Sequence, residues 1–547
     1  MKKKITAILS VVICLAVLCT LCTACMTKAV KSWESNEIVD DGNPYYKDYY
    51  HIFVYSFADG NGDGIGDLKG IEQKLDYIAN LGFTGIWLSP ISPSETYHKY
   101  DVTDYLNVDP EYGTLDDFKS LVSKAHEKGI SVMLDIVINH SSYKHPWFVE
   151  AQKAHRNGNV GNKYYDYYIF NSEDGSVYET FGNYTHMPKL NLDNAGVREE
   201  IDNICKFWLQ DYGVDAFRLD AAYHYYNGNA GDNIKFMQWL TATARKYNEN
   251  VYMVGEVMES DSVVYAHYAE DSVQSFFNFA LSNSYSKLNP AISVGTIDKA
   301  GKLQEVITAK EKGTAKGIDA LFTSNHDTSR ISNLGLNYFS TRQQEVTTDL
   351  FERHKMGVAL LYTQTGNVFN YYGNEIGMRN GVRRDPREDY VDQTYRLAMN
   401  WGDRTSITHE NGFAYQAYGV DTLFGAYEDY LGGVAEQIND QNSLYNFYRR
   451  VMLLRRQNPE IARGTSAFVA YQDTDVALIV RTYNGKSILL AYNLNGAESK
   501  TVDIAKVIAD NGLEGKLAGF LSSDNGRDVG MRGSALTLPQ FSIAVVR

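Results

Sequence analysis

Short apolar runs alternate with amphipathic stretches along most of the chain. Strands are predicted at the apolar runs 51–57, 83–88, 130–138, 214–220, 251–256, 275–279, 318–323 and 367–371. Helices are predicted where apolar positions recur at helical spacing, over 70–79, 115–128, 197–212, 233–247, 302–311 and 345–361. Strands that alternate with helical connections in this way predict an α/β fold, a parallel (β/α)8 TIM barrel.

Two segments depart from this alternation. Residues 141–192 are aromatic and polar, and they are too long for a simple connection. We therefore expect an inserted subdomain after the third strand. From residue 465 the pattern changes to short strands with turns, which predicts an all-β C-terminal β-sandwich domain over 465–547. The barrel then occupies residues 46–140 and 193–464.

The N-terminus has the pattern of a secretory signal. Lysines at 2–4 precede the apolar run 5–21, which is short for a membrane span, and Cys25 follows small residues. The end of this segment resembles a bacterial lipobox, although Cys22 stands where that motif usually has leucine. We expect a signal peptide over residues 1–25 and a lipid anchor on Cys25 at the extracellular face of a bacterial membrane, or secretion after ordinary cleavage. The polar segment 26–45 is predicted to be a tether.

Composition narrows the class of partner. The 547 residues carry a net charge of −15, which argues against nucleic acid or an anionic membrane surface as the partner. Many tyrosines (41) and glycines (44) suit a protein with many loops that binds a neutral, hydroxylated ligand. Beyond the signal segment the only cysteine is Cys205, so the mature chain forms no intramolecular disulfide. Cys205 falls in an apolar helical pattern and is expected to be inert core.

Acidic residues follow three of the predicted strands. Asp220 ends the run 214–220, Glu256 ends the next, and Asp327 follows the seventh. In a closed parallel barrel the carboxyl ends of the strands meet at one face. One acid after a strand is usually a helix cap, and Arg218 with Asp220 on one strand face is, taken alone, a structural ion pair. Three acids at matching places, accompanied by an arginine and two histidines, favour a catalytic site.

These strand ends resemble the motifs of a known enzyme family. DIVINH (135–140), FRLDAAYH (217–224), VGEV (254–257) and SNHD (324–327) are similar to the conserved strand-end motifs of the α-amylase family of glycoside hydrolases (family 13). The resemblance continues in the family's order through GFTGIWLSP (82–90), MPKLN (187–191) and GNVFNYYGNEIGM (366–378). MPKLN is similar to an intermediate group between oligo-1,6-glucosidases and neopullulanases, and the N-terminus resembles that of bacterial lipoprotein α-amylases.

The resemblance implies a role for each acid. Asp220 would be the nucleophile, Glu256 the general acid and then the base, and Asp327 the acid that holds sugar hydroxyls and helps to distort the ring. Such an enzyme retains the anomeric configuration and separates its two catalytic carboxyl groups by about 5–5.5 Å. We expect the nearby arginine to keep Asp220 ionised. The implied substrate-binding residues are Tyr100, His140, Arg218, His224 and His326.

A loop after the first strand is a candidate calcium site. Residues 59–67 read DGNGDGIGD and offer hard oxygen ligands at alternate positions. They resemble the calcium loop of the oligo-1,6-glucosidase-like branch, although a simple Gly/Asp turn is the alternative interpretation. The candidate ligands are Asp59, Asn61, Asp63, Asp67 and the carbonyl of Ile65.

Many α-amylases hold a further calcium ion between barrel and insert. Asn139 and the backbone of His224 match two of its ligand positions. Lys189 stands where calcium-dependent members have aspartate. An ammonium group there would replace the ion, so we expect no second calcium and do not assign Asn139 as a ligand.

The residues after the nucleophile bear on the substrate. Ala221 and Ala222 are similar to those of α-1,4-acting members, whereas α-1,6-specific members usually carry valine; Tyr223 replaces a lysine often found there. The resemblance therefore implies an extracellular α-amylase, a monomer that hydrolyses internal α-1,4 bonds of starch and maltooligosaccharides and touches the membrane only through its lipid. A 4-α-glucanotransferase or neopullulanase-like enzyme is the alternative. A non-catalytic glycan-binding protein is a third interpretation, but such proteins lose the acids.

Overall fold

A computed structural model describes residues 33–40, 42–282, 297, 299–332, 349–380, 391–402, 432–523 and 527–547. The chain divides into two compact units. One comprises Asp41–Met452, and the other combines Met1–Asp40 with Leu453–Arg547. The predicted signal segment and Cys25 lie outside the described residues, as does the start, 345–348, of the last predicted barrel helix.

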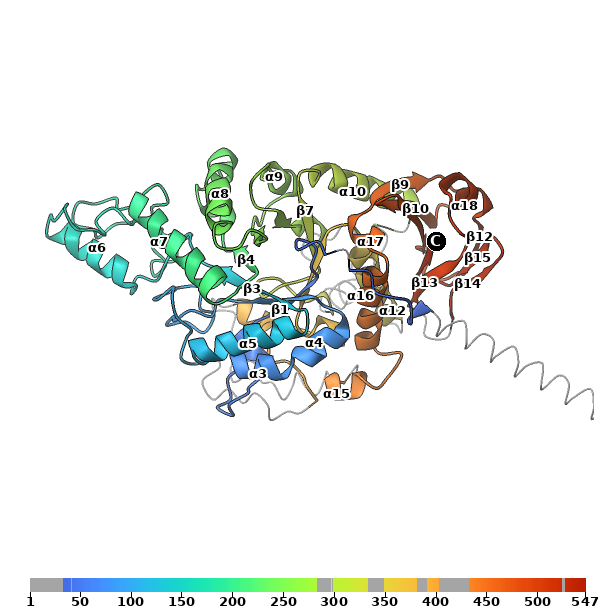
Figure 1. Cartoon of the computed structure of the whole chain (residues 1–547), viewed down its shortest axis with the longest axis horizontal. Helices are drawn as coiled ribbons and strands as arrows, with labels where there is room; N and C mark the ends of the chain where they lie inside the picture. The colour runs from blue at the N-terminus through green and yellow to red at the C-terminus, as the bar shows by residue number, and fades with distance from the viewer. Residues whose placement is uncertain are drawn as a thin grey trace, which may run out of the picture. The chain divides into compact units, whose positions relative to one another are not determined.

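Unit Asp41–Met452 contains a closed barrel of parallel strands in sequence order, with β8 paired to β1, which confirms the predicted fold (Figure 1). The strands are β1 (Tyr49–Ile52), β2 (Gly85–Leu88), β3 (Ser131–Ile136), β4 (Ala216–Leu219), β5 (Tyr252–Gly255), β6 (Ser275–Phe277), β7 (Ile318–Phe322) and β8 (Asn367–Tyr371).

Amphipathic helices cover the outside of the barrel, and in Figure 1 α3, α4 and α5 lie together beside β1 and β3. Thr114 begins α5 with a capping box, because it accepts the amide of Asp117 while Asp117 accepts its amide in return. The helices of this unit are α2 (Val54–Phe57), α3 (Leu68–Gln73), α4 (Leu75–Leu81), α5 (Leu115–Glu127), α6 (Pro146–Arg156), α7 (Ala195–Cys205), α8 (Ala230–Ala244), α9 (Asp261–Ala266), α10 (Ala300–Gly313), α12 (Asp349–Tyr362) and α15 (Val434–Gln437), and α16 (Leu444–Gln457) continues into the other unit.

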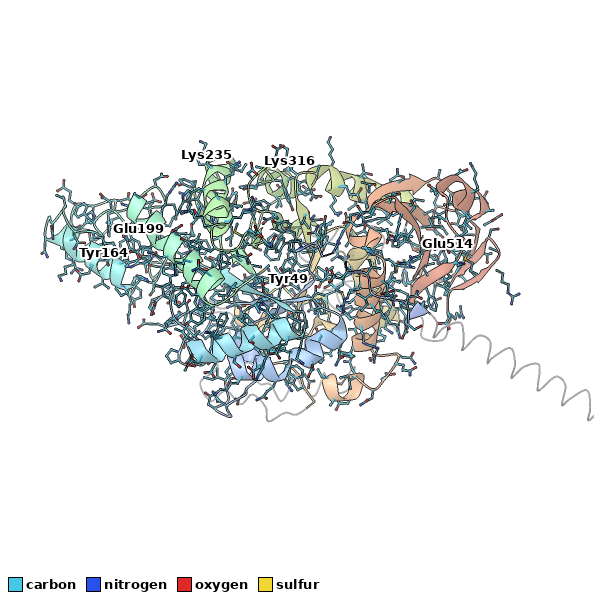
Figure 2. The ribbon with its side chains drawn as sticks, in the orientation of Figure 1. Tyr49, Tyr164, Glu199, Lys235, Lys316 and Glu514 are labelled. Atoms are coloured by element: carbon cyan, nitrogen blue, oxygen red, sulfur yellow. The ribbon has the colours of Figure 1, made fainter. Side chains whose placement is uncertain are left out.

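Aromatic side chains fill the interior of the barrel. The ring of Tyr49, labelled in Figure 2, stacks on Phe369 at 5.0 Å and on Tyr252 at 5.7 Å between ring centroids. Met133 and Ala216, from neighbouring strands, belong to the same buried cluster. The interior is therefore a packed core, which leaves the strand ends as the place where polar side chains gather.

Three predicted elements differ from the structure. The run 51–57 is a strand only to Ile52, and Val54–Phe57 then forms the short helix α2, all of whose side chains are buried. An uninterrupted apolar run lacks the periodicity that separates strand from helix. The helix predicted over 70–79 begins at Leu68, because Asp67 caps it, and it breaks at Lys74. The helix predicted over 197–212 ends as α7 at Cys205 and continues as a π-helical segment.

The segment 141–192 carries more regular structure than its composition predicts. Helix α6 begins at Pro146, whose missing amide proton suits the first helical position, and His145 caps it by accepting the amide of Trp147. Isolated β-bridges, such as that between Tyr168 and Leu190, connect other parts of the segment.

Cys205, on α7, is 2% exposed and forms no disulfide, as expected.

The second unit consists mainly of antiparallel sheets, which confirms the predicted C-terminal β domain. One sheet has the order β13-β16-β11-β10-β9 and the other β12-β15-β14. Short helices α17 and α18 are additions that the strand pattern did not predict. The elements are α17 (Glu460–Arg463), β9 (Thr465–Val469), β10 (Val476–Tyr483), β11 (Lys486–Asn493), β12 (Lys500–Asp503), α18 (Ala505–Asn511), β13 (Leu517–Ser522), β14 (Gly530–Arg532), β15 (Ala535–Leu538) and β16 (Ser542–Val546).

Residues 33–40 of the predicted tether contact other residues of the second unit. Trp33 is 4% exposed and its ring lies 5.9 Å from that of Phe520. The side chain of Gln457 donates to the carbonyls of Trp33 and Asn36, at 3.1 and 2.9 Å. Residues 33–40 therefore pack within the second unit, because the large aromatic side chain of Trp33 contacts an apolar partner. None of the helices in the described ranges is long and apolar enough to cross a membrane.

Candidate active site

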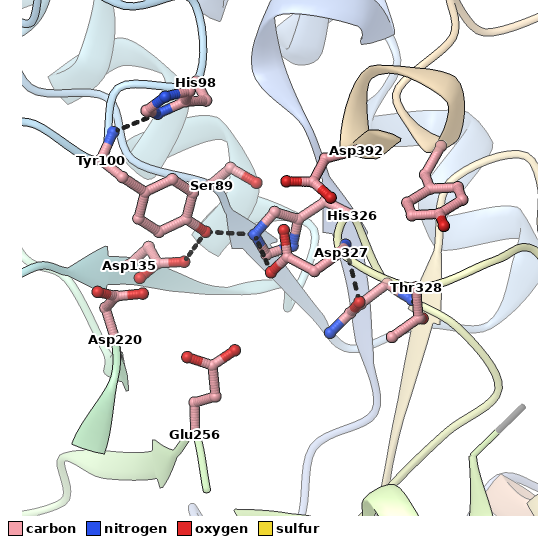
Figure 3. A network of polar contacts seen from close by, with 12 residues as sticks. Ser89, His98, Tyr100, Asp135, Asp220, Glu256, His326, Asp327, Thr328 and Asp392 are labelled. Carbon is pink, nitrogen blue, oxygen red and sulfur yellow. Dashed lines mark hydrogen bonds and ion pairs between the residues drawn. The ribbon is translucent and has the colours of Figure 1, made fainter. Parts of the chain in front are cut away.

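Arg218, on β4, joins the acids of three neighbouring strand ends. Its Nη1 lies 2.8 Å from Oδ1 of Asp135 and 2.7 Å from Oδ1 of Asp220, and its Nη2 lies 2.8 Å from Oε1 of Glu256. The guanidinium is 1% exposed. Since β3, β4 and β5 are consecutive parallel strands, their carboxyl ends bring these side chains together (Figure 3). The structure thus places the predicted nucleophile and the predicted general acid on one shared cation.

The turn after β4 aims a backbone donor at Glu256. Ala221 has a φ of 49°, a left-handed conformation that costs a residue with a Cβ about 1 kcal/mol. Its amide donates to Oε2 of Glu256 at 3.1 Å. Both carboxyl oxygens of Glu256 are therefore held, one by Arg218 and one by this turn.

Asp327 lies across the site with partners of its own. Its Oδ2 is 3.0 Å from Nε2 of His326, and its Oδ1 is 2.7 Å from Nη2 of Arg396. The hydroxyl of Tyr100 lies 2.5 Å from Nε2 of His326 and donates to Oδ2 of Asp135 at 3.0 Å, and the rings of Tyr100 and His326 stack with 4° between their planes. Tyr100 therefore links His326 to Asp135, which Arg218 also bonds; Figure 3 shows the contacts of Tyr100 with His326 and Asp135.

Burial and charge divide the acids into two electrostatic classes. Burial raises the pKa of Asp220 and of Glu256, and it raises the pKa of Asp135 to about 8, although Arg218 opposes all three shifts. One guanidinium cannot neutralise three carboxylates, so the three groups compete for it and their ionisation is coupled, which allows Asp220 to be ionised while Glu256 holds a proton. Our expectation that Arg218 would hold the pKa of Asp220 down is therefore corrected, because burial outweighs it.

Asp327 shifts in the opposite direction. Burial tends to raise its pKa, but His326, Arg396 and Arg218 together hold the pKa of Asp327 well below its usual range. This carboxyl has two partners that the acids of the Arg218 cluster do not share. It therefore stays ionised at lower pH than the acids that share Arg218.

The two predicted substrate histidines on the insert side lie against one phenylalanine. His140 is 1% exposed, and burial lowers its pKa to about 3, so its ring is neutral. Its Nε2 has no hydrogen-bond partner within the described part of the chain. The ring of Phe181 stacks on His140 at 4.9 Å and meets the ring of His224 edge-on at 5.2 Å. A neutral imidazole with an unused nitrogen suits a sugar hydroxyl, which can donate or accept.

Sequence reasoning missed Arg396, which organises one side of the site. Arg396 bonds Asp327 and two further groups. Its Nε donates to the carbonyl of His326 at 2.9 Å, and its Nη1 donates to the hydroxyl of Tyr97 at 2.9 Å. It is 4% exposed. The one available signal was a charged residue directly before the apolar run 397–399.

Lys189, which is expected to replace a second calcium ion, bonds two oxygen atoms of the segment after β4. Its Nζ donates to the carbonyl of His224 at 2.8 Å and to Oδ1 of Asn227 at 2.9 Å. Oxygen atoms that could ligate a cation are thus bonded by an ammonium group. Burial lowers the pKa of Lys189.

The loop 59–67 turns its side-chain oxygens toward its own backbone. Asp67, 2% exposed, accepts the amides of Gly60, Asn61 and Gly70, and Asp59 accepts those of Gly62 and Gly64. Among the described residues no three His, Cys, Asp or Glu side chains form a group that could hold a metal ion. The donor type fits calcium, since each carboxylate keeps further lone pairs.

The chain is similar to several enzymes over most of its length. It is 33% identical to α-amylase 3 of Dictyoglomus thermophilum, over 83% of this chain and 86% of that protein. It is 27% identical to an oligo-1,6-glucosidase of Parageobacillus thermoglucosidasius, over 82% and 89% of the two chains. It is equally identical to a 4-α-glucanotransferase of Thermotoga maritima, over 82% and 96%.

A solved structure and a family model agree with the barrel and its strand ends. Amy13B of Eubacterium rectale superposes with a TM-score of 0.79 at 33% identity, over 94% of this chain and 96% of that one. Residues 51–464 match the family model described as the α-amylase catalytic domain, and this range contains Asp220, Glu256 and Asp327. The chain therefore belongs to the α-amylase family of glycoside hydrolases and transferases, family 13.

Proposed function

We propose that the protein is a retaining α-amylase that hydrolyses internal α-1,4-glucosidic bonds of starch and maltooligosaccharides. The observation that carries this proposal is the shared guanidinium of Arg218, which bonds Asp220 and Glu256 at 2.7 and 2.8 Å. Two carboxyl groups on adjacent strand ends that bond one side chain supply the nucleophile and the acid that a double displacement needs.

The chemistry uses each acid once in each half of the reaction. Asp220 attacks the anomeric carbon while Glu256, whose raised pKa keeps its proton, protonates the oxygen of the leaving sugar. The glycosyl ester on Asp220 then reacts with water, whose proton goes to Glu256. Because the anomeric carbon is attacked twice, its configuration is retained.

The remaining polar groups hold the sugar. Asp327 stays ionised and accepts hydroxyl protons, which helps to hold a distorted ring. His140 and His326 bond hydroxyls of the same sugar, and Tyr100 offers its ring face for stacking. This function of Tyr100 is consistent with its fixed position against His326.

Product analysis tests the reaction and its stereochemistry. Proton NMR during the first minutes of maltopentaose cleavage is expected to show the α-anomer before mutarotation, and early β-anomer would exclude the double displacement. Asp220→Asn and Glu256→Gln are each expected to lower kcat by more than about 10³-fold, with Tyr164→Phe on the insert as a control.

A transferase is the second candidate, because a 27% identical relative carries the name 4-α-glucanotransferase. Both reactions pass through the same ester on Asp220 and differ in whether water or a sugar attacks it. Chromatography of products from starch, pullulan and maltotetraose, with and without added glucose, separates them. Products longer than the substrate would identify transfer.

Two further features belong to the proposal. The mature protein is held outside the cell by a lipid on Cys25. A lipid-sized mass increase on the N-terminal peptide that is lost in Cys25→Ala would support this, and an unmodified peptide would refute it.

Calcium binds in the loop 59–67 through Asp59, Asn61, Asp63, Asp67 and the carbonyl of Ile65, where it would stabilise the fold near β1.

A further inference from the structure

The residue before Tyr100 carries a buried ion pair in the loop between β2 and α5. Nζ of Lys99 lies 2.9 Å from Oδ2 of Asp109 and 2.6 Å from Oε2 of Glu111. The side chains of Lys99 and Asp109 are 3% and 5% exposed, whereas that of Glu111 is 45% exposed. Asp109 therefore neutralises Lys99 in the interior, and the contact with Glu111 is open to solvent.

Asp109 bonds the lysine from a fixed place in this loop. Its amide donates to the carbonyl of Ile91 at 2.7 Å, and its carboxyl group accepts the amides of Ser94 at 3.1 Å and Glu111 at 3.0 Å. The bonds with Ile91 and Ser94 join the segment that follows β2 to the segment that precedes α5. An ammonium group bonded to Asp109 is thus fixed relative to the end of the barrel strand from which the loop departs.

The backbone of Lys99 has a conformation that needs support. Its φ is 64°, in the left-handed region, which is unfavourable for any residue with a Cβ. Such a conformation persists where the surrounding contacts fix it. The ion pair with Asp109 fixes the side-chain end, and the amide of Lys99 donates to the carbonyl of Thr96 at 3.2 Å. The turn at residue 99 therefore depends on the buried pair.

This turn sets the direction in which Tyr100 leaves the backbone. The amide of Tyr100 donates to Nδ1 of His98 at 3.1 Å (Figure 3). Burial lowers the pKa of His98 to about 3, so its ring is neutral and Nδ1 can accept this bond. At its other end, the hydroxyl of Tyr100 lies 3.0 Å from Asp135 and 2.5 Å from His326. The left-handed residue 99 is thus at the base of the side chain that joins these two groups.

We propose that Lys99 is a positioning residue, whose ion pair with Asp109 fixes the turn that directs Tyr100 into the active site. This inference rests on the proposed function, in which Tyr100 offers its ring to the sugar. The ammonium group of Lys99 is bonded to the two acids of its own loop, so it acts on the reaction through Tyr100. When the pair is broken the turn relaxes, and Tyr100 spends less of its time in the position that bonds Asp135.

A double-mutant cycle with Tyr100 separates positioning from a structural contribution. Lys99→Met keeps the apolar stem and removes the charge. We expect it to lower kcat/KM for maltopentaose about tenfold, the lower end of what one hydrogen bond to a charged group contributes. In a Tyr100→Ala background the same change is expected to alter kcat/KM by less than about twofold, because the side chain that Lys99 positions is gone. The Tm is expected to fall equally in both backgrounds, since each loses the ion pair.

The two acids that bond Lys99 provide a matched comparison. Asp109→Asn is expected to lower kcat/KM about as much as Lys99→Met, and the double variant no further, because both changes break the same pair. Glu111→Gln, at the exposed partner, is expected to stay within about twofold of wild type. Lys99→Gly, which adopts the turn without strain but lacks the pair, is expected to show the same dependence on Tyr100 and serves if Lys99→Met does not fold.

Two results would overturn the positioning role. One is a tenfold loss from Lys99→Met that persists in the Tyr100→Ala background, because Lys99 would then act by another route. The other is an equal effect of Asp109→Asn and Glu111→Gln on kcat/KM, because the buried pair would then have no special part.

Calorimetry keeps this test separate from the proposed reaction. In a Glu256→Gln background, Lys99→Met is expected to raise the Kd for maltopentaose about fivefold, and Glu111→Gln to leave it unchanged. An unchanged Kd in Lys99→Met would refute the positioning of Tyr100 whether or not the wild type hydrolyses maltopentaose. A raised Kd in a protein whose wild type shows no hydrolysis would support the positioning role and refute only the hydrolase.

Discussion

Replacement of Arg396 by alanine tests the reasoning about charge in the site most directly. The side chain is buried and donates to Asp327 at 2.7 Å, to the carbonyl of His326 at 2.9 Å and to the hydroxyl of Tyr97 at 2.9 Å. Alanine removes the cation and leaves these acceptors without it. We expect a defect in catalysis rather than a mere loss of packing.

The size of the effect follows from the contact with Asp327. A hydrogen bond to a charged partner contributes about 1.5–3 kcal/mol. If about 2 kcal/mol of that reaches the transition state through Asp327, kcat/KM falls about 30-fold. Arg396→Lys keeps the charge but cannot repeat three bonds from one planar group, so its kcat/KM is expected to lie between the two.

The pH profile separates this role from a structural one. Asp327 acts ionised, and Arg396 helps to hold its pKa low. Without Arg396 the pKa of Asp327 rises, so the carboxyl is protonated at higher pH than before and the acid limb of kcat/KM moves toward neutrality. Because the pKa of Asp327 is depressed in the folded protein, its ionised carboxyl stabilises the fold above the pKa that it has in the unfolded chain. This stabilisation is lost as the pH falls through the folded pKa. Arg396→Ala is expected to lose part of it at every pH where it is present.

The assay is kcat/KM for maltopentaose across pH 4 to 9, with Arg156→Ala, an exposed arginine on the insert, as the control. A variant within about threefold of wild type and with an unmoved acid limb would refute the assignment of Arg396. A uniform loss at every pH, matched by a lower Tm, would reduce Arg396 to a structural residue.

Four further results are expected. Lys99, 3% exposed with a φ of 64° and bonded to Asp109 at 2.9 Å, should tolerate glycine better than alanine by about 1 kcal/mol in thermal unfolding, since both lose the ion pair and only glycine relieves the strain; equal Tm values would contradict this. The raised pKa of Glu256 should place the alkaline limb of kcat/KM above the ordinary glutamate value, and a limb near pH 4.3 would contradict it. Lys189→Ala should cost about 1 kcal/mol of unfolding free energy, as the carbonyl of His224 and the side chain of Asn227 lose their donor, and no change would argue against that contact. A strong chelator should lower the Tm if calcium binds at 59–67, and an unchanged Tm would argue against a bound ion.

The barrel could be predicted because parallel strands are covered on both faces. Such strands read as apolar runs, and the acids at their ends stand out against those runs, as Asp220 does after β4. Where burial is complete on all sides the pattern loses information, so the run 51–57 predicts a single strand although α2 follows β1 within it. The aromatic and polar composition of the insert does not predict helix α6, whose local signal is Pro146 at its first position.

The rest of the site could not be predicted because it depends on contacts that sequence distance hides. Arg396 reaches Asp327 across 69 positions and belongs to no strand end. Trp33 stands in a polar segment whose composition predicts a tether, yet it packs against Phe520 in the other half of its unit. Periodicity reports local burial, whereas these contacts depend on the topology of the whole chain.

The division of the cations among the acids accounts for the division of their roles. Asp220 and Glu256 must pass through protonated or esterified states in turn, and they share one guanidinium with Asp135. With one positive charge among three carboxyls, their ionisation is coupled and protons can be exchanged. Asp327 must stay ionised throughout, and it lies 2.7 Å from Nη2 of Arg396 and 3.0 Å from Nε2 of His326. Asp220 and Asp327 thus obtain opposite pKa shifts, because Asp220 competes with two other carboxyl groups for Arg218, whereas Asp327 is bonded by Arg396 and by the ring of His326.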